Sequence, residues 1–351
     1  MSTIDQAGPA NAAKNPVGLR GLAFAELCGS EPELRALLGA LGFSHTRRHA
    51  SRALDVYTQG SATFLVNDEP DTHAAEFRAA HGPCVSALGF AVDDPAQAFS
   101  EARARGARPY TGRAARAIDA PAVHGVGDSL IYFVAAGRES AVMRECPAVE
   151  RPTLVPDRGL LCFDHLTNNV AKGELATWAK FYEEVFGFTH VRSFDIKGNK
   201  TGLYSFALRS PDGSFCIPIN EDKGGTGQIA EYLKEYRGAG IQHIALLSND
   251  LLSTLDRIDG AVPTLDIDDS YYENAFARVP GVRENPERIR AHNVLIDGDP
   301  EGYLLQIFTK NCVGPIFFEL IQRENHLSFG EGNFGALFRS IERDQERRGV
   351  I

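Results

Sequence analysis

An internal repeat constrains the fold of this chain more than any other feature of its sequence. The segment 21–27 (Gly-Leu-Ala-Phe-Ala-Glu-Leu) precedes the helix-like segment 31–43, and the segment 160–166 (Leu-Leu-Cys-Phe-Asp-His-Leu) precedes the helix-like segment 174–188. In both places a short apolar strand pattern changes to helical spacing. The sequence therefore predicts two related halves, each opening with a strand and a helix.

The two halves match again further along the chain. The segment 85–94 (Val-Ser-Ala-Leu-Gly-Phe-Ala-Val-Asp-Asp) parallels 241–250 (Ile-Gln-His-Ile-Ala-Leu-Leu-Ser-Asn-Asp), and 129–134 parallels 315–320. This doubled order of strand, helix and further strands predicts an α+β fold in which the strands of each module curl around a pocket.

A carboxylate stands in an unfavourable place in the second half. Glu319 lies within the apolar strand-like segment 314–322, and the alternation of side chains along a strand places it on the same face as Phe317 and Ile321. An ionised carboxylate costs several kcal/mol there unless a positive or hydrogen-bonding group meets it. A bound metal ion, an arginine or a backbone amide would each meet that need.

Two histidines stand in apolar strand patterns in the same manner. Strand alternation predicts that His165 shares a face with Phe163, and that His243 shares a face with Ile241. Either histidine alone is ordinary in a protein core. Together with Glu319, however, they are the ligand types of the facial triad that binds non-haem Fe(II), although these ligands alone do not distinguish iron from manganese or cobalt.

The first half lacks this set of residues. Ala87 stands where His243 stands in the second half, the segment 129–134 contains no acid, and the segment 21–27 contains no histidine. The metal site is therefore expected wholly in the second half. The expected organisation is a disordered arm at 1–15, an N-terminal scaffold domain without metal at 16–145, a Pro-rich linker at 146–158 and a C-terminal catalytic domain at 159–351.

The composition argues against several kinds of partner. A net charge of −10 disfavours nucleic acid and anionic membrane surfaces, and no apolar run approaches the ~20 residues that span a bilayer. The six cysteines are scattered without a Cys-x-x-Cys pair, so they indicate reduced thiols rather than a disulfide framework or a zinc motif. A cytoplasmic location is expected.

Five longer motifs occur in the second half, at 163–170 (Phe-Asp-His-Leu-Thr-Asn-Asn-Val), 240–245, 304–310, 314–323 and 329–345. Together they resemble the 4-hydroxyphenylpyruvate dioxygenase family. The resemblance implies the vicinal-oxygen-chelate fold, in which paired βαβββ modules form two open barrel-like domains. It also implies that His165, His243 and Glu319 bind one Fe(II) per subunit, with no further cofactor.

The same resemblance implies a set of substrate-binding residues by position in these motifs. They comprise polar residues, an apolar wall and one residue of the closing helix: Ser205, Asn220, Gln228, Gln242 and Gln306; Pro218, Phe308, Phe329, Phe334 and Leu337; and Asn333. The segment 332–348 has an apolar stripe and a highly charged remainder, which predicts a helix. That helix is either a lid over the pocket or a packed terminal helix.

The reaction implied by the resemblance converts 4-hydroxyphenylpyruvate and O2 to homogentisate and CO2 in tyrosine catabolism. Oxidative decarboxylation is followed by ring hydroxylation and migration of the side chain. Because the substrate carries its own 2-oxo acid, a separate 2-oxoglutarate is not needed. The resemblance further suggests a homodimer or homotetramer.

Three other interpretations compete with this one. A 4-hydroxymandelate synthase resembles the family and uses the same substrate and ligands, but tends to carry aliphatic residues at the positions of Phe334 and Asn220. The presence of both residues, with Pro218, favours the ring-hydroxylating enzyme. A glyoxalase-like isomerase or an extradiol-type ring-cleaving enzyme is a second alternative, but an isomerase would need a second metal-binding carboxylate, and none stands in the matching strands. A binding module without catalysis would not need the His–His–Glu set.

Overall fold

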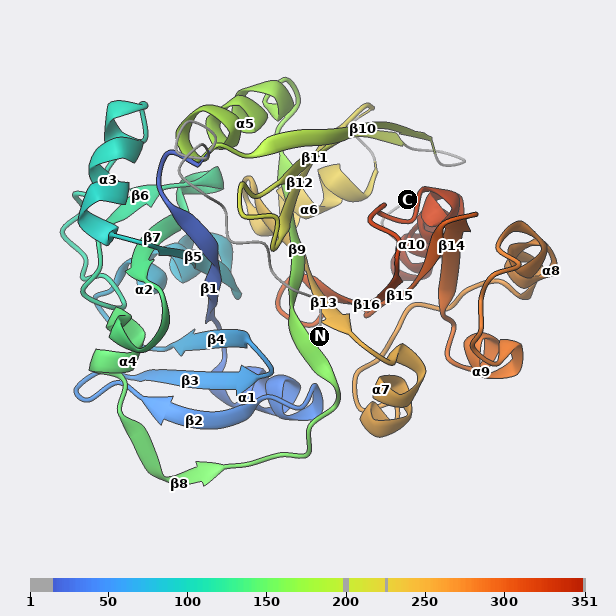
Figure 1. Ribbon diagram of the computed structural model, residues 1–351, viewed down its shortest axis with the longest axis horizontal. Coiled ribbons are helices and arrows are strands. Elements are labelled where there is room, and N and C mark those ends of the chain that lie inside the picture. The colour runs from blue at the N-terminus through green and yellow to red at the C-terminus, as the bar shows by residue number, and fades with distance from the viewer. Residues whose placement is uncertain (1–14, 198–201, 225–226, 350–351) are drawn as a thin grey trace.

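The computed structural model describes residues 15–197, 202–224 and 227–349, so residues 1–14 of the arm expected to be disordered lie outside it (Figure 1). Within these ranges the chain forms two eight-stranded sheets of mixed parallel and antiparallel strands. Among the described helices, none is long and apolar enough to cross a membrane.

The first half of the chain forms the first sheet. Its strands are β1 (Leu19–Cys28), β2 (Ser44–Arg48), β3 (Leu54–Gln59), β4 (Ala62–Asn67), β5 (Cys84–Val92), β6 (Ala122–His124), β7 (Leu130–Ala135) and β8 (Ala148–Thr153). Its helices are α1 (Glu31–Ala40), α2 (His73–His81), α3 (Pro95–Ala104) and α4 (Ala141–Glu145), with short 3-10 turns η2 (Val126–Asp128) and η3 (Gly137–Glu139).

The second half forms the second sheet. Its strands are β9 (Leu160–Val170), β10 (Thr189–Lys197), β11 (Gly202–Arg209), β12 (Cys216–Asp222), β13 (Gly240–Ser248), β14 (Leu295–Asp299), β15 (Gly302–Phe308) and β16 (Phe317–Glu324). Its helical elements are α5 (Leu175–Phe181), the π-helical turn η4 (Tyr182–Phe186), α6 (Gln228–Tyr236), α7 (Leu251–Ile258), α8 (Asp269–Arg278), α9 (Pro286–Ala291), η5 (Glu331–Asn333) and α10 (Phe334–Arg348).

Seven strands have the same order in both sheets, which confirms the predicted repeat. This order is β6-β7-β5-β1-β4-β3-β2 in the first sheet and β15-β16-β13-β9-β12-β11-β10 in the second, and one additional strand, β8 or β14, lies at opposite edges of the two sheets. In both, the opening strand is antiparallel to one neighbour and parallel to the other. Strand β8 pairs with β2 and lies within the segment 146–158, so the expected linker contributes a strand to the first sheet.

Equivalent acids begin equivalent helices in the two halves. The side chain of Asp94 accepts hydrogen bonds from the backbone N–H groups of Ala96 and Gln97 at the start of α3. The side chain of Asp250 accepts one from Ser253 at the start of α7. Such caps satisfy N–H groups that the first helical turn leaves unpaired, so each strand ends in a helix at the same point.

The concave face of the first sheet is filled by its own side chains. Phe24 and Tyr132 both pair with Gly89 in the sheet register, and their rings lie 5.9 Å apart. A Cβ atom at Gly89 would lie only 2.2 Å from the ring of Phe24, so this position requires glycine. The first half therefore presents a packed apolar cluster where the second half has its site.

Aromatic contacts join the two halves into one core. Phe64 of β4 packs edge-on against Phe163 of β9, with ring centroids 5.2 Å apart. Phe90 of β5 packs in the same manner against Phe186, at 5.3 Å. Buried residues from both sheets thus form one continuous hydrophobic cluster, which holds the second sheet in a fixed position against the first.

Candidate metal centre and substrate cavity

Three neighbouring strands of the second sheet bring the three residues predicted as metal ligands together. In the register of β9, β13 and β16, Ala245 pairs with His165 on one side and with Glu319 on the other. His243 stands two residues before Ala245 and therefore on the same face of β13. Adjacent strands thus present two imidazoles and one carboxylate to the same side of the sheet.

The ligand atoms of these side chains converge on one point. The Nε2 atom of His165 lies 3.1 Å from an Oε atom of Glu319, and the Nε2 atom of His243 lies 3.5 Å from the same oxygen. The two Nε2 atoms are 3.3 Å apart. All three ligand atoms therefore lie within 4.8 Å of one another, and they form the one group of this kind among the described residues.

The electrostatics of the group favour a cation. Burial would lower the pKa of His165, but Glu319 and Asp164 outweigh that effect and raise it to about 9. Burial and the charge of His165 hold the pKa of His243 well below its ordinary value. One proton thus occupies a position between three Lewis-basic atoms, and a divalent metal binding there would displace it.

Both histidines are preceded by a residue that has no cross-strand partner. Asp164 on β9 and Gln242 on β13 are each skipped in the register of the two strands, which is the pattern of a β-bulge. An oxygen of Asp164 lies 2.7 Å from Nδ1 of His165, and Oε1 of Gln242 lies 3.1 Å from Nδ1 of His243. Each Nδ1–H donates to an oxygen, so Nε2 is left to face a metal.

These bulges show that two predictions of which side chains share a face with the histidines were wrong. Strand alternation predicted His165 beside Phe163 and His243 beside Ile241. Because the bulge adds a residue before each histidine, Phe163 instead pairs with Leu246, on the opposite face of the sheet from His165. Ile241 is displaced in the same way from the face of His243. The predicted set of inward ligands is unaffected, since both histidines follow the bulges and the register of β16 has no shift.

A cavity of about 600 Å³ opens from the three residues. Nine of the predicted substrate-binding residues line it: Ser205, Asn220, Gln228, Gln242, Pro218, Phe308, Phe329, Phe334 and Leu337. Six further residues that the sequence did not single out for the substrate also line it: Thr167, Phe194, Ile196, Leu203, Phe317 and Phe338. Thr167 and Phe317 stand two residues from His165 and Glu319, so the strand period could have identified them.

The two remaining predicted residues, Gln306 and Asn333, lie outside the cavity lining. Gln306 is 1% exposed and lies beneath Gly330, where a Cβ atom would approach its Nε2 to 2.5 Å. Asn333 is fully buried, and its Oδ1 accepts a hydrogen bond of 2.6 Å from the hydroxyl of Tyr271. Asn333 therefore fixes the start of α10 against α8 instead of facing the cavity.

Amide side chains give one part of the cavity wall a polar character. Asn220 of β12 pairs with Ser205 of β11 and donates a hydrogen bond of 3.3 Å to Asn169. Gln242 donates a hydrogen bond of 3.3 Å to Gln228. A ligand in this cavity would therefore meet hydrogen-bonding groups on β11 and β12 and the two imidazoles and the carboxylate on β9, β13 and β16.

Helix α10 closes the cavity on the remaining side. Phe334 packs edge-on against Phe194 of β10 at 5.2 Å, and Leu337 and Phe338 continue the apolar wall. The outer face of the helix is fixed to the segment before α8, where Ser340 donates to the carbonyl oxygen of Asp266 at 2.7 Å. The helix covers the cavity, as expected of a lid, and it is also packed onto the domain, as expected of a terminal helix. The two alternatives that the sequence left open are therefore compatible.

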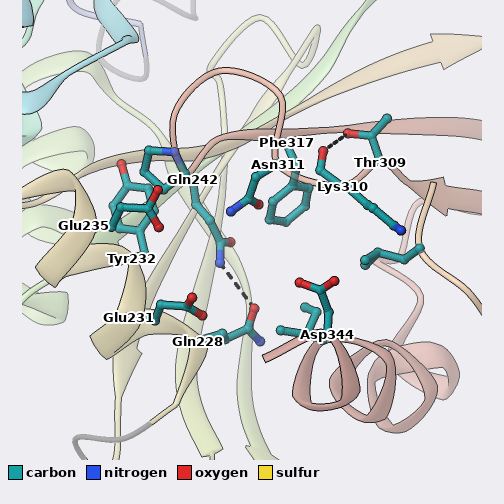
Figure 2. Close-up of a pocket in the computed structure, with 13 residues that line it drawn as sticks. Gln228, Glu231, Tyr232, Glu235, Gln242, Thr309, Lys310, Asn311, Phe317 and Asp344 are labelled. Carbon is teal, nitrogen blue, oxygen red and sulfur yellow. Dashed lines mark hydrogen bonds between the residues drawn. The ribbon is translucent and has the colours of Figure 1, made fainter. Parts of the chain in front are cut away.

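A second cavity of about 500 Å³ adjoins the first (Figure 2). The two share Gln228, Gln242 and Phe317, and Figure 2 shows the hydrogen bond between the two glutamine side chains at their boundary. The second cavity is lined by carboxylates from α6 and α10, including Glu231 and Asp344. Its negative lining distinguishes it from the mainly apolar cavity beside His165, His243 and Glu319.

Comparisons with known proteins place both halves of the chain. The family model described as "Hydroxyphenylpyruvate dioxygenase, HPPD, N-terminal" matches residues 13–145. The model of the Glyoxalase/Bleomycin resistance protein/Dioxygenase superfamily matches residues 163–307. The second match spans His165, His243 and the strands between them.

Similar proteins cover almost the whole chain. The chain is 48% identical over 343 residues to Protein MelA of Shewanella colwelliana, a match covering 96% of this chain and 99% of that protein. It is 41% identical over 347 residues to 4-hydroxyphenylpyruvate dioxygenase of Pseudomonas aeruginosa, covering 96% and 97%. Among solved structures, a mutant of 4-hydroxymandelate synthase from Streptomyces coelicolor superposes with a TM-score of 0.78 at 27% identity, covering 93% and 99%.

Proposed function

Because this chain belongs to the 4-hydroxyphenylpyruvate dioxygenase family of the vicinal-oxygen-chelate superfamily, we propose that it converts 4-hydroxyphenylpyruvate and O2 to homogentisate and CO2. The reaction would be a step in tyrosine catabolism. The observation that carries the proposal is the convergence of His165, His243 and Glu319 at a cavity that has both an aromatic wall and hydrogen-bonding amides.

The three side chains fit an Fe(II) ion, one per chain. Two imidazole nitrogens and one carboxylate oxygen are the donor set of a facial triad, and their Nδ1 partners already orient both histidines. When bound, Fe(II) supplies one-electron chemistry with O2 that protein side chains do not provide. Because a facial triad leaves positions open, the 2-oxo acid of the substrate has room to bind beside it.

The remaining residues of the cavity orient the substrate and exclude water. With the 2-oxo acid at the three ligands, the phenol end extends toward Ser205 and Asn220, whose polar groups can hold its hydroxyl. Phe329 packs against the ring of His165 at 5.5 Å and forms part of the cavity wall beside the three ligands. Helix α10 covers the aromatic ring with Phe334 and Leu337, which keeps bulk water from the reacting carbon.

A 4-hydroxymandelate synthase is the alternative, and the structural match to such an enzyme supports it. The two reactions share their substrate, so the shape of the cavity around the ring decides between them. Phe334 lies against Phe194, with Asn220 and Pro218 also in the wall. These residues favour attack on the ring, because the synthase tends to carry smaller aliphatic groups at the positions of Phe334 and Asn220.

Product analysis tests the proposal. The full chain, loaded with Fe(II) under anaerobic conditions, is mixed with 4-hydroxyphenylpyruvate and O2, and the products are separated by chromatography. Homogentisate is the expected product, and Glu319→Ala should yield none. Formation of 4-hydroxymandelate by the wild-type chain would instead establish the alternative, and the absence of O2 uptake would refute both.

A further inference from the structure

Asp164 occupies the bulge of β9 directly before His165. In a regular strand, consecutive side chains point to opposite faces, so Asp164 would turn away from the imidazole of His165. Because Asp164 has no partner on β13, the backbone is bent at this residue and the carboxylate reaches Nδ1 of His165 at 2.7 Å. Bulges of this kind redirect side chains beside functional sites.

Arg323 of β16 holds that carboxylate in place. Its Nε and one terminal nitrogen donate to the two oxygens of Asp164, at 2.7 and 2.8 Å. The two side chains are only 13% and 12% exposed. A paired guanidinium–carboxylate contact of this geometry fixes the plane of the carboxylate as well as its position.

The same guanidinium also holds the loop that leads to α10. Its other terminal nitrogen donates to the carbonyl oxygens of His326 at 3.0 Å and Ser328 at 2.6 Å. The next residue, Phe329, lies over the guanidinium at 5.9 Å and against His165 at 5.5 Å. Arg323 thus joins the metal-binding histidine to the chain segment that forms the cavity wall.

The repeat provides an internal comparison for this pair. The first sheet has the same bulge on its opening strand, and the unpaired residue there is Ala23. The register places Phe24 at the position of His165 and Tyr132 at that of Glu319. Four residues after Tyr132, where the second half has Arg323, the first half has Ala136.

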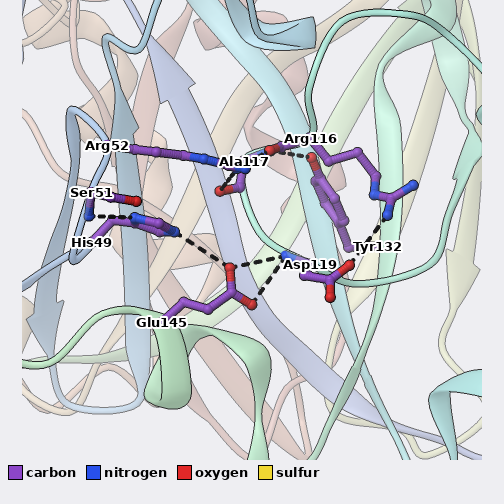
Figure 3. Close-up of polar contacts among 8 residues, drawn as sticks. All are labelled: His49, Ser51, Arg52, Arg116, Ala117, Asp119, Tyr132 and Glu145. Atoms are coloured by element: carbon purple, nitrogen blue, oxygen red, sulfur yellow. Dashed lines mark hydrogen bonds and ion pairs between the residues drawn. The ribbon is translucent and has the colours of Figure 1, made fainter.

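The half without metal ligands therefore has alanine at both positions of the pair. Its concave face is instead closed by apolar packing and by a loop, whose Ala117 donates a backbone hydrogen bond to the hydroxyl of Tyr132 on β7 (Figure 3). In the same view Glu145 accepts hydrogen bonds from the N–H of Asp119 (Figure 3). The fold forms its bulge without an acid, so Asp164 and Arg323 are not required by the fold itself.

We propose that Asp164 and Arg323 are positioning residues of the metal centre: Asp164 orients the ring of His165, and Arg323 couples that orientation to the loop 325–330. The assignment rests on the proposed function only in taking His165, His243 and Glu319 as the metal ligands. Because coupling between two sites is reciprocal, metal binding also orders the loop that carries Phe329.

The test measures metal affinity without turnover. Apoprotein is titrated anaerobically with Co(II) by calorimetry, and the visible spectrum of the bound Co(II) is recorded. The double variant Asp164→Ala/Arg323→Ala reproduces the residues of the first half and leaves no buried charge without its partner. Its affinity for Co(II) should fall about 10- to 100-fold, the range observed for partners that orient metal ligands, with a changed Co(II) spectrum.

Three further variants, Asp164→Ala, Asp164→Asn and a control in the first half, separate positioning from general stability. Asp164→Asn keeps an oxygen acceptor for Nδ1 of His165, so its affinity for Co(II) should fall less than that of Asp164→Ala. The matched control, Arg35→Ala/Asp55→Ala, removes an ion pair of the first half, between Arg35 of α1 and the buried Asp55 of β3. The control should unfold at lower temperature but keep the Co(II) affinity of the wild type.

Hydrogen exchange tests the coupling to the loop. In the wild type, Co(II) should slow amide exchange in the loop 325–330, and in the double variant it should not. An unchanged Co(II) affinity and spectrum in a folded double variant would overturn the assignment. A wild type that binds Co(II) but forms no homogentisate with Fe(II) would refute the proposed function and leave the assignment intact, because affinity is measured without substrate.

Discussion

Replacing the buried carboxylate Glu26 with glutamine should stabilise this protein at neutral pH. Glu26 is 1% exposed in the first sheet, and one of its oxygens accepts hydrogen bonds of 3.0 Å from both Asn67 and Ser86. Its other oxygen has no hydrogen-bond partner among the described residues. Burial outweighs these hydrogen bonds and raises the pKa of Glu26 from 4.5 to about 6.

The sign of the effect follows from that shift. Because the folded pKa is the higher one, the folded state retains a proton between pH 4.5 and about 6 that the unfolded state has released. The stabilisation is complete below pH 4.5 and is lost as the pH rises through about 6. At about 1.4 kcal/mol per pKa unit, the charged form destabilises the fold by about 2 kcal/mol at pH 8.

Urea unfolding at pH 4.5 and pH 8 measures this difference. Glu26→Gln keeps an oxygen for Asn67 and Ser86 and carries no charge, so it should be about 1–2 kcal/mol more stable than the wild type at pH 8. The difference should be much smaller at pH 4.5. The control Asp55→Asn should lose stability at pH 8, because Asp55 has charged partners in Arg35 and Arg48. If Glu26→Gln is no more stable than the wild type at pH 8, water reaches this carboxylate and the reasoning is wrong.

Three further predictions concern the second half. Metal at one hundred times its dissociation constant should raise the free energy of unfolding of the wild type by about 2.7 kcal/mol, as measured by calorimetric scans. Glu319→Gln should show no such increase, and an equal increase in both proteins would exclude Glu319 as a ligand. Phe334→Ile should raise the ratio of 4-hydroxymandelate to homogentisate about tenfold or more, which corresponds to ~1.4 kcal/mol between the two barriers; an unchanged product ratio by chromatography would remove Phe334 from the specificity argument. A chain that ends at Glu331 lacks α10 and should therefore lose turnover. It should still bind metal, because the three predicted ligands lie on β9, β13 and β16. Full activity of this chain would show that α10 is not a lid.

The parts of this fold that the sequence predicted depend on local patterns. The repeat is visible because strand and helix periods recur in matched segments, such as 85–94 and 241–250. Inward-facing His243 and Glu319 were recognisable because a charged or polar side chain interrupts an apolar strand. Each of these signals requires only the residues of one element.

The parts that the sequence did not predict depend on contacts between distant segments. The Asp164–Arg323 pair joins residues 159 positions apart in the chain, and the bulge that makes it possible is defined only by the pairing of β9 with β13. The same bulge explains why the prediction from strand alternation that Phe163 lies beside His165 was wrong. Gln306 and Asn333 were assigned to the substrate by their motifs, but packing against Gly330 and Tyr271 places them outside the cavity lining.

The most direct test of a single iron site in this protein is a titration of its activity with iron. Apoprotein receives increasing Fe(II) under anaerobic conditions, and the rate of homogentisate formation is measured after the addition of 4-hydroxyphenylpyruvate and O2. The rate should rise linearly and reach its maximum at one Fe(II) per chain, and His165→Ala should show no activity at any iron concentration. Homogentisate formation by that variant at the wild-type rate, or a rise that ends at another stoichiometry, would contradict the assignment of a single His165–His243–Glu319 iron site.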